Sequence, residues 1–294
     1  MRVFVTGATG FVGSAIVSEL LANDHQVLGL ARNDAAADSL ARRGVEVHRG
    51  DLTDLDSLTA GARACEAVIH TAFIHDFSQW AANIEIDLQA LKAMIGVLEG
   101  TGKPLISTSG LALHSPGQVC TEAVSAVRGA PRSDAEFEVL GAAERGVRSI
   151  LVRLPPSVHG AGDHGFVPQL VEIARRKGVA AYVGDGANRW PAVHRTDAAR
   201  AYRLALETAP AGTRVHAVAE TGVPMRAIAE TIGAGLGLPT RSLTQDEAAA
   251  HFEWFAMFAA IDCPASSAIT RELLGWAPTG PDLLTDIREN GYFG

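Results

Sequence analysis

Three glycines near the start of the chain are spaced to hold a phosphate group. Gly7, Gly10 and Gly13 form a GxxGxxG pattern that follows an apolar run, MRVFVT, and opens a helical pattern. The first glycine permits a tight turn, the second lets the backbone approach a diphosphate, and the third lets the helix lie close to the strand. Backbone amides and the positive helix end then face the anion. The motif predicts a dinucleotide site rather than a glycine-rich turn without a ligand. Its expected lining residues are Gly7, Thr9, Gly10, Phe11 and Val12.

The end of the second predicted strand, residues 25–31, indicates which dinucleotide binds. A carboxylate at this point suits the ribose 2′-hydroxyl of NAD, whereas a cation suits the 2′-phosphate of NADP. Arg32 comes first after the strand, and Asp34 follows two residues later. An arginine can pair bidentately with a phosphate. We therefore predict NADP(H) rather than NAD(H) as the cofactor, the alternative being that Arg32 is a solvated surface residue.

Short apolar runs alternate with helical patterns through the first half of the chain. Strands are predicted at residues 1–6, 25–31, 45–48, 67–71, 104–108 and 147–154, and helices at 11–23, 35–43, 80–98 and 133–145, with a further helix capped by Thr53. This alternation is typical of βαβ units in a Rossmann-type, doubly wound parallel α/β sheet. We expect a dinucleotide-binding domain over residues 1–155, with later returns near 190–209. Residues 156–294 should form a discontinuous, mostly helical lobe that binds the substrate.

Composition excludes several classes of protein. The net charge of −8 does not suggest a surface that binds nucleic acid or anionic membranes. No apolar stretch reaches the roughly 18 residues of a membrane span. The three cysteines have no metal-ligand spacing, and so sparse a set suits a reducing compartment. We expect a cytoplasmic protein with a small-molecule substrate and no metal site, nucleic acid partner or membrane partner.

Further motifs follow the glycines in a fixed order. They are TGATGFVG (6–13), GDL (50–52), VIHTAF (68–73), STS (107–109), RLPPSVHG (153–160), PAVHRTD (191–197) and LGWAP (274–278). Together they resemble the extended short-chain dehydrogenase/reductase family, which includes NAD(P)-dependent epimerases and dehydratases, over nearly the whole chain. The resemblance adds Asp51, Leu52, Thr71, Ala72, Phe73, Ser107, Pro155 and Val158 to the expected cofactor site. Asp51 could instead be only a turn residue, and His70 could be a buried histidine whose hydrogen bonds are satisfied within the protein.

The chain departs from this family at its catalytic residues. The family combines a serine or threonine with Tyr-xxx-Lys, but none of the three tyrosines here has a lysine four residues later. Alignment on Glu136 and Arg153 puts the lysine position on Arg132 and the tyrosine position on Arg128. Arg132 is then expected either to hold the nicotinamide ribose or to pair with Glu136 on the helix. Ser109 is expected to orient the substrate oxygen.

The proton donor must then be another group. His159 occupies the position of a family tyrosine next to the cofactor, and a histidine has a pKa suited to proton transfer near neutral pH. The other candidates are His114, His164, Tyr182 and His194. Arg189 beside Trp190 is a further candidate for binding an anionic or sugar-like substrate, or else a surface arginine that covers an apolar ring.

These residues predict an NADP(H)-dependent oxidoreductase with a non-standard proton donor. Hydride would move to or from a carbonyl, alcohol or imine carbon of a small molecule. The alternatives are a nucleotide-sugar-type epimerase or dehydratase, and a non-catalytic NADP(H)-binding sensor. By analogy with the family, residues 80–98 and 133–145 would form the interface of a homodimer.

Overall fold

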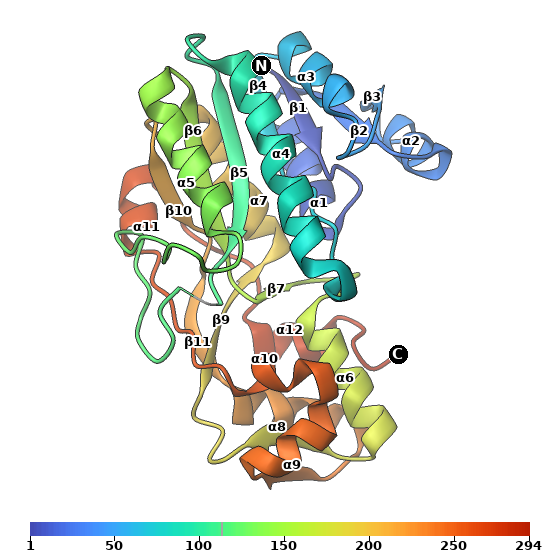
Figure 1. The fold of residues 1–294 in the computed structure, drawn as a ribbon. Helices are drawn as coiled ribbons and strands as arrows, with labels where there is room; N and C mark the ends of the chain where they lie inside the picture. Colours follow the sequence, from blue (N-terminus) through green and yellow to red (C-terminus); the bar gives the residue numbers. More distant parts are fainter. Residues whose placement is uncertain (113) are drawn as a thin grey trace.

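A parallel sheet of seven strands forms the centre of the larger part of the molecule (Figure 1). The computed structural model describes residues 1–112 and 114–294. The strand order is β10-β6-β5-β4-β1-β2-β3. The strands are β1 (Arg2–Thr6), β2 (Gln26–Ala31), β3 (Glu46–Arg49), β4 (Ala67–His70), β5 (Pro104–Gly110), β6 (Arg148–Leu154) and β10 (Thr213–His216). The predicted doubly wound α/β fold is confirmed.

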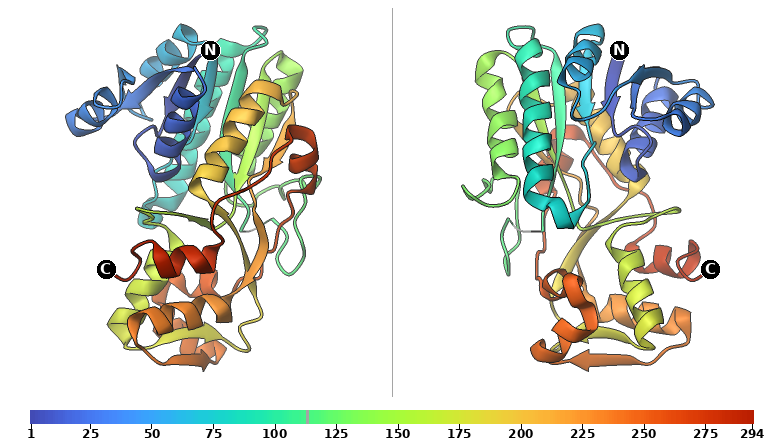
Figure 2. Two further views of the ribbon diagram at one scale, coloured as in Figure 1. Left: turned by 180° about the vertical axis from the view of Figure 1, so that it is seen from behind. Right: turned by 45° about the vertical axis from the view of Figure 1, so that its right-hand side comes forward.

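Helices cover both faces of this sheet. One face carries α3 (Leu55–Ala64), η1 (Phe77–Gln79), α4 (Trp80–Leu98), α5 (Ser133–Gly141) and η2 (Ala142–Arg145); the other carries α1 (Phe11–Ala22), α2 (Asp34–Ala41) and α7 (Arg195–Thr208). The left view of Figure 2, seen from behind, shows α1 (blue) and α7 (yellow-orange) side by side on the near face of the sheet. Because both faces are covered, the strands read as nearly continuous apolar runs. β1, for example, buries four of its five residues.

One strand of the sheet, β10, is not predicted from the sequence pattern. All six predicted strands are present, but β10 comes from residues 213–216, beyond the predicted returns near 190–209. After β6 the chain crosses the smaller lobe and returns to the sheet through α7, so β10 does not follow directly in the alternation that predicts the other six strands. One predicted cap is also wrong. Asp54, not Thr53, is the N-cap of α3, because its carboxylate accepts the Ser57 amide at 3.0 Å.

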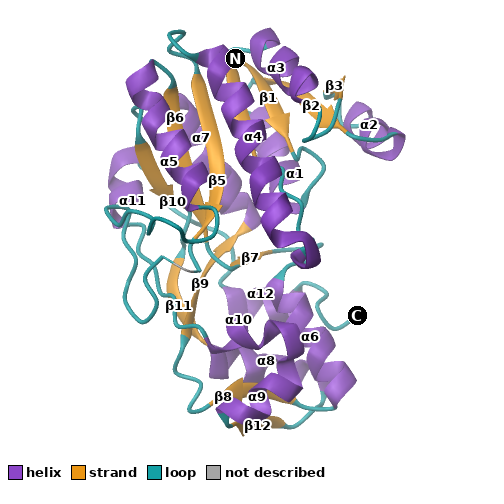
Figure 3. Ribbon diagram, viewed as in Figure 1, coloured by secondary structure: helices purple, strands orange, loops and turns teal. Residues whose placement is uncertain are grey.

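The smaller lobe lies beyond the carboxyl ends of the strands (Figure 3). It contains α6 (Phe166–Lys177), β8 (Ala180–Val183), α8 (Met225–Leu236), β12 (Thr240–Leu243), α9 (Gln245–Phe252), η3 (Glu253–Phe255), α10 (Ala256–Ala260) and α12 (Leu283–Glu289). A three-stranded sheet, β7 (Ser157–His159), β9 (Arg189–His194) and β11 (Glu220–Pro224), joins the two parts, and α11 (Ala268–Leu274) returns to β10. No helix of the described residues is long and apolar enough to cross a membrane.

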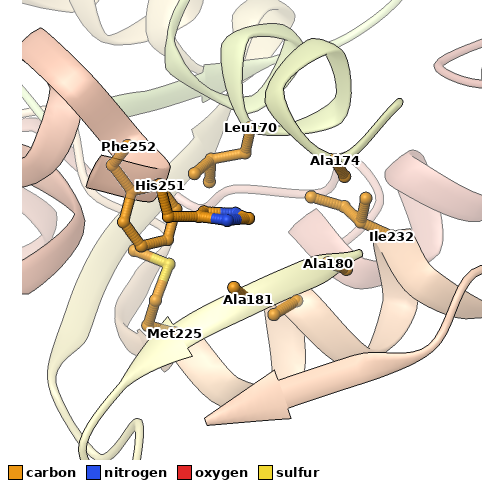
Figure 4. A pocket seen from close by; sticks show the side chains of 9 residues that line it. Leu170, Ala174, Ala180, Ala181, Met225, Ile232, His251 and Phe252 are labelled. Carbon is orange, nitrogen blue, oxygen red and sulfur yellow. The ribbon is translucent and has the colours of Figure 1, made fainter. Parts of the chain in front are cut away.

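The core of the lobe encloses a very small cavity. His251 projects into it from α9, and apolar side chains such as Leu170, Met225 and Phe252 surround the ring (Figure 4). Its free volume of about 10 Å³ is at most that of one water molecule. A space of this size is a packing defect rather than a ligand site.

Candidate functional site

The glycine-rich turn after β1 has no room for side chains at two of its three glycines. Gly7 adopts a left-handed conformation with φ of +69°, and a Cβ there would lie 2.7 Å from both the Ala72 amide nitrogen and Thr71 Oγ1. A Cβ on Gly13 would lie 2.0 Å from the Gly7 carbonyl oxygen. Helix α1 therefore starts in direct contact with the turn, while Thr9 and Gly10 are exposed at its tip. This cradle fits the diphosphate of a dinucleotide.

An arginine that the sequence analysis missed lies beside this turn. The Arg195 guanidinium carbon is 4.6 Å from the centre of the Phe11 ring, and its nitrogens donate to Ser14 Oγ at 3.0 Å and the Ala161 carbonyl at 2.8 Å. The His164 ring meets another edge of Phe11, with 5.7 Å between ring centres. The start of α1 is thus linked to the loop after β7, and a fixed cation lies next to the expected diphosphate position.

The end of β2 presents an unpaired arginine. Arg32 is exposed and has no hydrogen bond or ion pair with any other residue that the structure describes. Asp34 instead pairs with Arg49 on β3, with 2.8 Å between nitrogen and oxygen. The Asp51 carboxylate accepts hydrogen bonds from both the amide and the hydroxyl of Thr53, at 3.0 and 2.9 Å, so Asp51 has the turn role considered for it. Its contact with the cofactor stays a prediction. Leu52 is buried beside Asp51.

A chain of buried polar side chains runs from the glycine-rich turn to the far side of β4. Thr6 Oγ1 lies 2.8 Å from Nδ1 of His70, and Nε2 of His70 lies 3.1 Å from Oδ1 of Asp87 on α4. All three residues are at most 1% exposed. The expectation that His70 is a satisfied, buried histidine is confirmed. The pKa of Asp87 is lowered: its hydrogen bond with His70 and the charge of Arg132 outweigh burial, which acts the other way.

Arg132 is the last member of this series of bonded side chains, and its backbone has an unusual conformation. Its NH2 donates to Asp87 Oδ2 at 3.2 Å and to the Thr108 carbonyl at 3.0 Å, and its guanidinium lies 4.2 Å above the Phe73 ring. Its φ of +62° is left-handed, which costs a non-glycine residue energy and commonly marks a functional position. Arg132 precedes α5 instead of lying on it, and its predicted pairing with Glu136 is wrong.

Glu136 belongs to a second buried cluster. Its carboxylate accepts Arg153 NH2 at 2.6 Å and lies 2.9 Å from Nε2 of His114. Although burial opposes ionisation, the hydrogen bonds and charges of His114 and Arg153 lower the pKa of Glu136 to about 2. Arg153 is fully buried and also approaches His216. This cluster ties α5 to β6 and fixes the backbone next to Ser109.

Ser109 lies near the carboxyl end of β5, directly opposite Arg153 on β6. It is 6% exposed, and its hydroxyl makes no hydrogen bond with other described residues. Ser107, two residues earlier on the same face of the strand, is similarly buried. The carbonyl of the intervening Thr108 is the group that binds Arg132. Ser109 and the guanidinium bound to its neighbour Thr108 therefore both lie at the carboxyl end of β5, where ligands bind in open α/β sheets.

His159 does not reach this point. Its ring is fully buried, Nδ1 lies 2.9 Å from Oδ2 of Asp286, and Nε2 faces the protein interior. A ring with no exposed surface cannot contact a substrate, so the structure contradicts His159 as the proton donor. The sequence could not show this, because Asp286 lies 127 residues further along the chain. Pro155 and Val158, which flank it, remain cofactor contacts only as predictions.

Most other candidate substrate-binding residues also have internal partners. Arg189 forms a two-point ion pair with Asp262, and Trp190 is fully buried in the lobe core. His194 lies 2.7 Å from Thr196 Oγ1. Tyr182 is on β8, at the distal side of the lobe. Ser109 and Arg132 stay the predicted catalytic residues, and the guanidinium of Arg189 is already paired with Asp262.

Comparison with known proteins places the chain in a family. A sequence model of the NAD dependent epimerase/dehydratase family matches residues 3–100. An uncharacterised protein of Schizosaccharomyces pombe is 48% identical over the full length of both chains. A 2-alkyl-3-oxoalkanoate reductase of Stenotrophomonas maltophilia is 31% identical over 81% of this chain and 77% of its own. The chain belongs to the NAD-dependent epimerase/dehydratase family, within the extended short-chain dehydrogenase/reductases.

A solved structure confirms the fold over the whole chain. The dTDP-glucose 4,6-dehydratase of Streptomyces venezuelae, crystallised with NAD, has a TM-score of 0.79 and covers 99% of this chain and 95% of its own, at 19% identity. The family and its relatives indicate an NAD(P)-dependent enzyme of the reductase, epimerase or dehydratase class.

Proposed function

We propose that the protein is an NADP(H)-dependent reductase of a carbonyl group in a small molecule. The observation that carries the proposal is the position of Arg132, which is fixed by Asp87 and by the carbonyl of Thr108, the residue before Ser109. Reduced nicotinamide, when bound, supplies hydride to a carbonyl carbon. The residues near Ser109 must then hold the carbonyl oxygen while negative charge develops on it.

Ser109 and Arg132 have complementary parts in this proposal. The Ser109 hydroxyl donates a hydrogen bond to the oxygen and sets its direction. The positive charge of the Arg132 guanidinium stabilises the developing oxyanion. Its contacts with Asp87 and Thr108 fix it before the substrate arrives, so little reorganisation is needed during the reaction.

The preference for NADP(H) rests on the end of β2. Arg32 is exposed and unpaired among the described residues, whereas the carboxylate of Asp34 is already engaged by Arg49. A ribose 2′-phosphate would gain a charge-assisted hydrogen bond from Arg32. A ribose 2′-hydroxyl would have to compete with Arg49 for Asp34.

Two relatives favour ketone reduction over sugar chemistry. The Stenotrophomonas relative is named for reduction of 2-alkyl-3-oxoalkanoates, and a protein of Stigmatella aurantiaca, 28% identical over 72% of this chain, is named as a ketoreductase. Epimerisation and dehydration also need a base, and the family tyrosine is missing here. The homodimer through α4 and α5 and the cytoplasmic location stay predictions.

The proposal is tested by NADPH oxidation across a panel of ketones, 3-oxo acids and imines. We expect turnover with at least one class and a loss of about 10²–10³-fold in kcat for Arg132→Ala, the range typical of removing one oxyanion donor. Calorimetry should show that this variant still binds NADPH. Tight NADPH binding by the unmodified protein with no turnover on any panel member would instead favour a non-catalytic sensor.

A further inference from the structure

Reduction of a carbonyl leaves an alkoxide that needs a proton, and neither Ser109 nor Arg132 supplies it. The tyrosines are engaged or distant. Tyr202 is fully buried, bonds to Thr108 Oγ1 at 2.7 Å and has its pKa raised by burial. Tyr292 donates to Asp163 at 2.9 Å, and Tyr182 lies beneath Arg226 in the lobe. The histidines have chemistry that suits proton transfer near neutral pH.

Eight of the ten histidines are buried or half-buried, and each of their rings is bonded to or enclosed by the protein. They are His25 (bonded to Glu207), His48 (Ser57), His70 (Thr6 and Asp87), His114 (Glu136), His159 (Asp286), His194 (Thr196), His216 (Ser266) and His251 (in the lobe core). The two that remain, His75 and His164, are both exposed. They lie in the loops after β4 and β7.

The contacts of these two rings place them at different parts of the cofactor site. His164 packs edge-on against Phe11, the first residue of α1, so it lies at the diphosphate end. His75 packs edge-on against Phe73, with 5.1 Å between ring centres, and the same Phe73 ring carries Arg132 at 4.2 Å. His75 is therefore the exposed histidine at the Arg132 and Ser109 end.

We propose that His75 is the proton donor for carbonyl reduction, an inference that rests on the function proposed above. The carbonyl carbon receives hydride from C4 of the reduced nicotinamide, and the C=O π pair moves onto oxygen. The oxygen takes the proton of the His75 imidazolium, which leaves an alcohol, oxidised cofactor and neutral imidazole. Because the ring is exposed, solvent returns the proton. The same ring accepts the proton when the alcohol is oxidised.

The charges around His75 define the expected pH dependence. Arg132, His164 and Asp87 face it from the neighbouring elements, and Asp76 follows it in the chain. Although part of the ring is exposed to solvent, the surrounding protein desolvates it, and this effect first and then the positive charge of Arg132 lower the pKa of His75 below its usual value near 6.5. The imidazolium is therefore present only on the acid side. Reduction should slow as pH rises through this lowered pKa, while oxidation should speed up.

The experiment compares His75→Gln with the matched variant His164→Gln, both at exposed histidines on facing loops. We expect His75→Gln to lose about 10²–10⁴-fold in kcat, the usual size of general acid catalysis. It should lose the pH dependence of kcat, keep its NADPH dissociation constant within about twofold, and regain activity with added imidazole. His164→Gln should keep the slope of the pH profile.

Opposite results would overturn the inference. His75→Gln with most of its kcat and an unchanged pH profile would exclude it as the donor. The inference would also be excluded if His164→Gln, rather than His75→Gln, lost kcat and regained it with added imidazole. Failure of the proposed function is separate, because it would appear as no turnover in the unmodified protein, before either variant is made.

Discussion

The Arg132 guanidinium donates to the Asp87 carboxylate across 3.2 Å, and that carboxylate is already bonded to His70. His70 in turn meets Thr6, the residue before Gly7. The candidate oxyanion-binding group is thus fixed from the same point of the sheet that forms the glycine-rich turn. A shift of the turn and a shift of Arg132 are mechanically linked through four side chains.

Asp87→Asn should impair catalysis more than cofactor binding. The amide can keep one hydrogen bond, but Arg132 loses the charge that holds it, and a half-buried cation without its partner is costly. We expect kcat to fall about tenfold and the free energy of unfolding to fall by about 2 kcal/mol, in line with a weakened charged hydrogen bond. Steady-state kinetics and denaturant unfolding measure both. Glu85→Gln, at an exposed position of the same helix, is the control and should change neither.

Arg32→Ala should weaken NADPH binding selectively. Loss of a charge-assisted hydrogen bond of about 1.5–3 kcal/mol corresponds to roughly 10–100-fold in the dissociation constant. NADH lacks the 2′-phosphate, so its affinity should stay the same. Fluorescence titration with both cofactors measures this difference. Arg42→Ala removes the same charge at the opposite end of α2 and should leave the preference intact; tighter binding of NADH than NADPH by the unmodified protein would refute the preference.

Local signals were enough for the fold and the turn, but not for the partners of the polar residues. The spacing of Gly7, Gly10 and Gly13 predicts their conformations because each requirement lies within one turn of chain. The spacing of Asp87 and Asn83 contains a weaker signal: both are polar, and both lie on the face of the helix that Leu91 continues and that is buried. Such groups require partners.

Long-range pairing explains the remaining errors. No residue near His159 in the sequence predicts its hydrogen bond with Asp286. Likewise, no residue near Arg132 predicts its left-handed backbone or its hydrogen bond with Asp87 on α4. Helical spacing suggested Glu136 for Arg132, but Arg153 from β6 takes that carboxylate. These choices are made by tertiary packing, which spacing alone does not encode.

Stability should fall steadily as the pH is lowered from 7. Burial lowers the pKa of His216 to about 3, so below pH ~6.5 the unfolded chain takes up a proton that the folded protein refuses. Glu136, with its pKa lowered to about 2, contributes stability above pH ~4.5 that is lost as the pH falls toward 2, amounting to about 3 kcal/mol. Denaturant unfolding at pH 7.5, 5.5 and 4 measures the slope. In Glu136→Gln the part of the slope below pH 5 should shrink; an equal slope in both proteins would contradict this assignment.

Two glycine-to-alanine substitutions should change stability in opposite directions. A Cβ at Gly13 would lie 2.0 Å from the Gly7 carbonyl oxygen, so the turn must move, at a cost of about 1–3 kcal/mol for overpacking. Because the displaced turn is the expected diphosphate cradle, NADPH affinity should drop at least about tenfold.

Gly96 is exposed on α4, and a Cβ added there would have no neighbour within 4 Å among the described residues. Gly96→Ala should therefore stabilise the protein by about 0.5–1 kcal/mol and leave NADPH binding unchanged. Thermal unfolding and calorimetry of the pair measure both effects, and Gly13→Ala with unaltered NADPH affinity would remove the turn from the cofactor site.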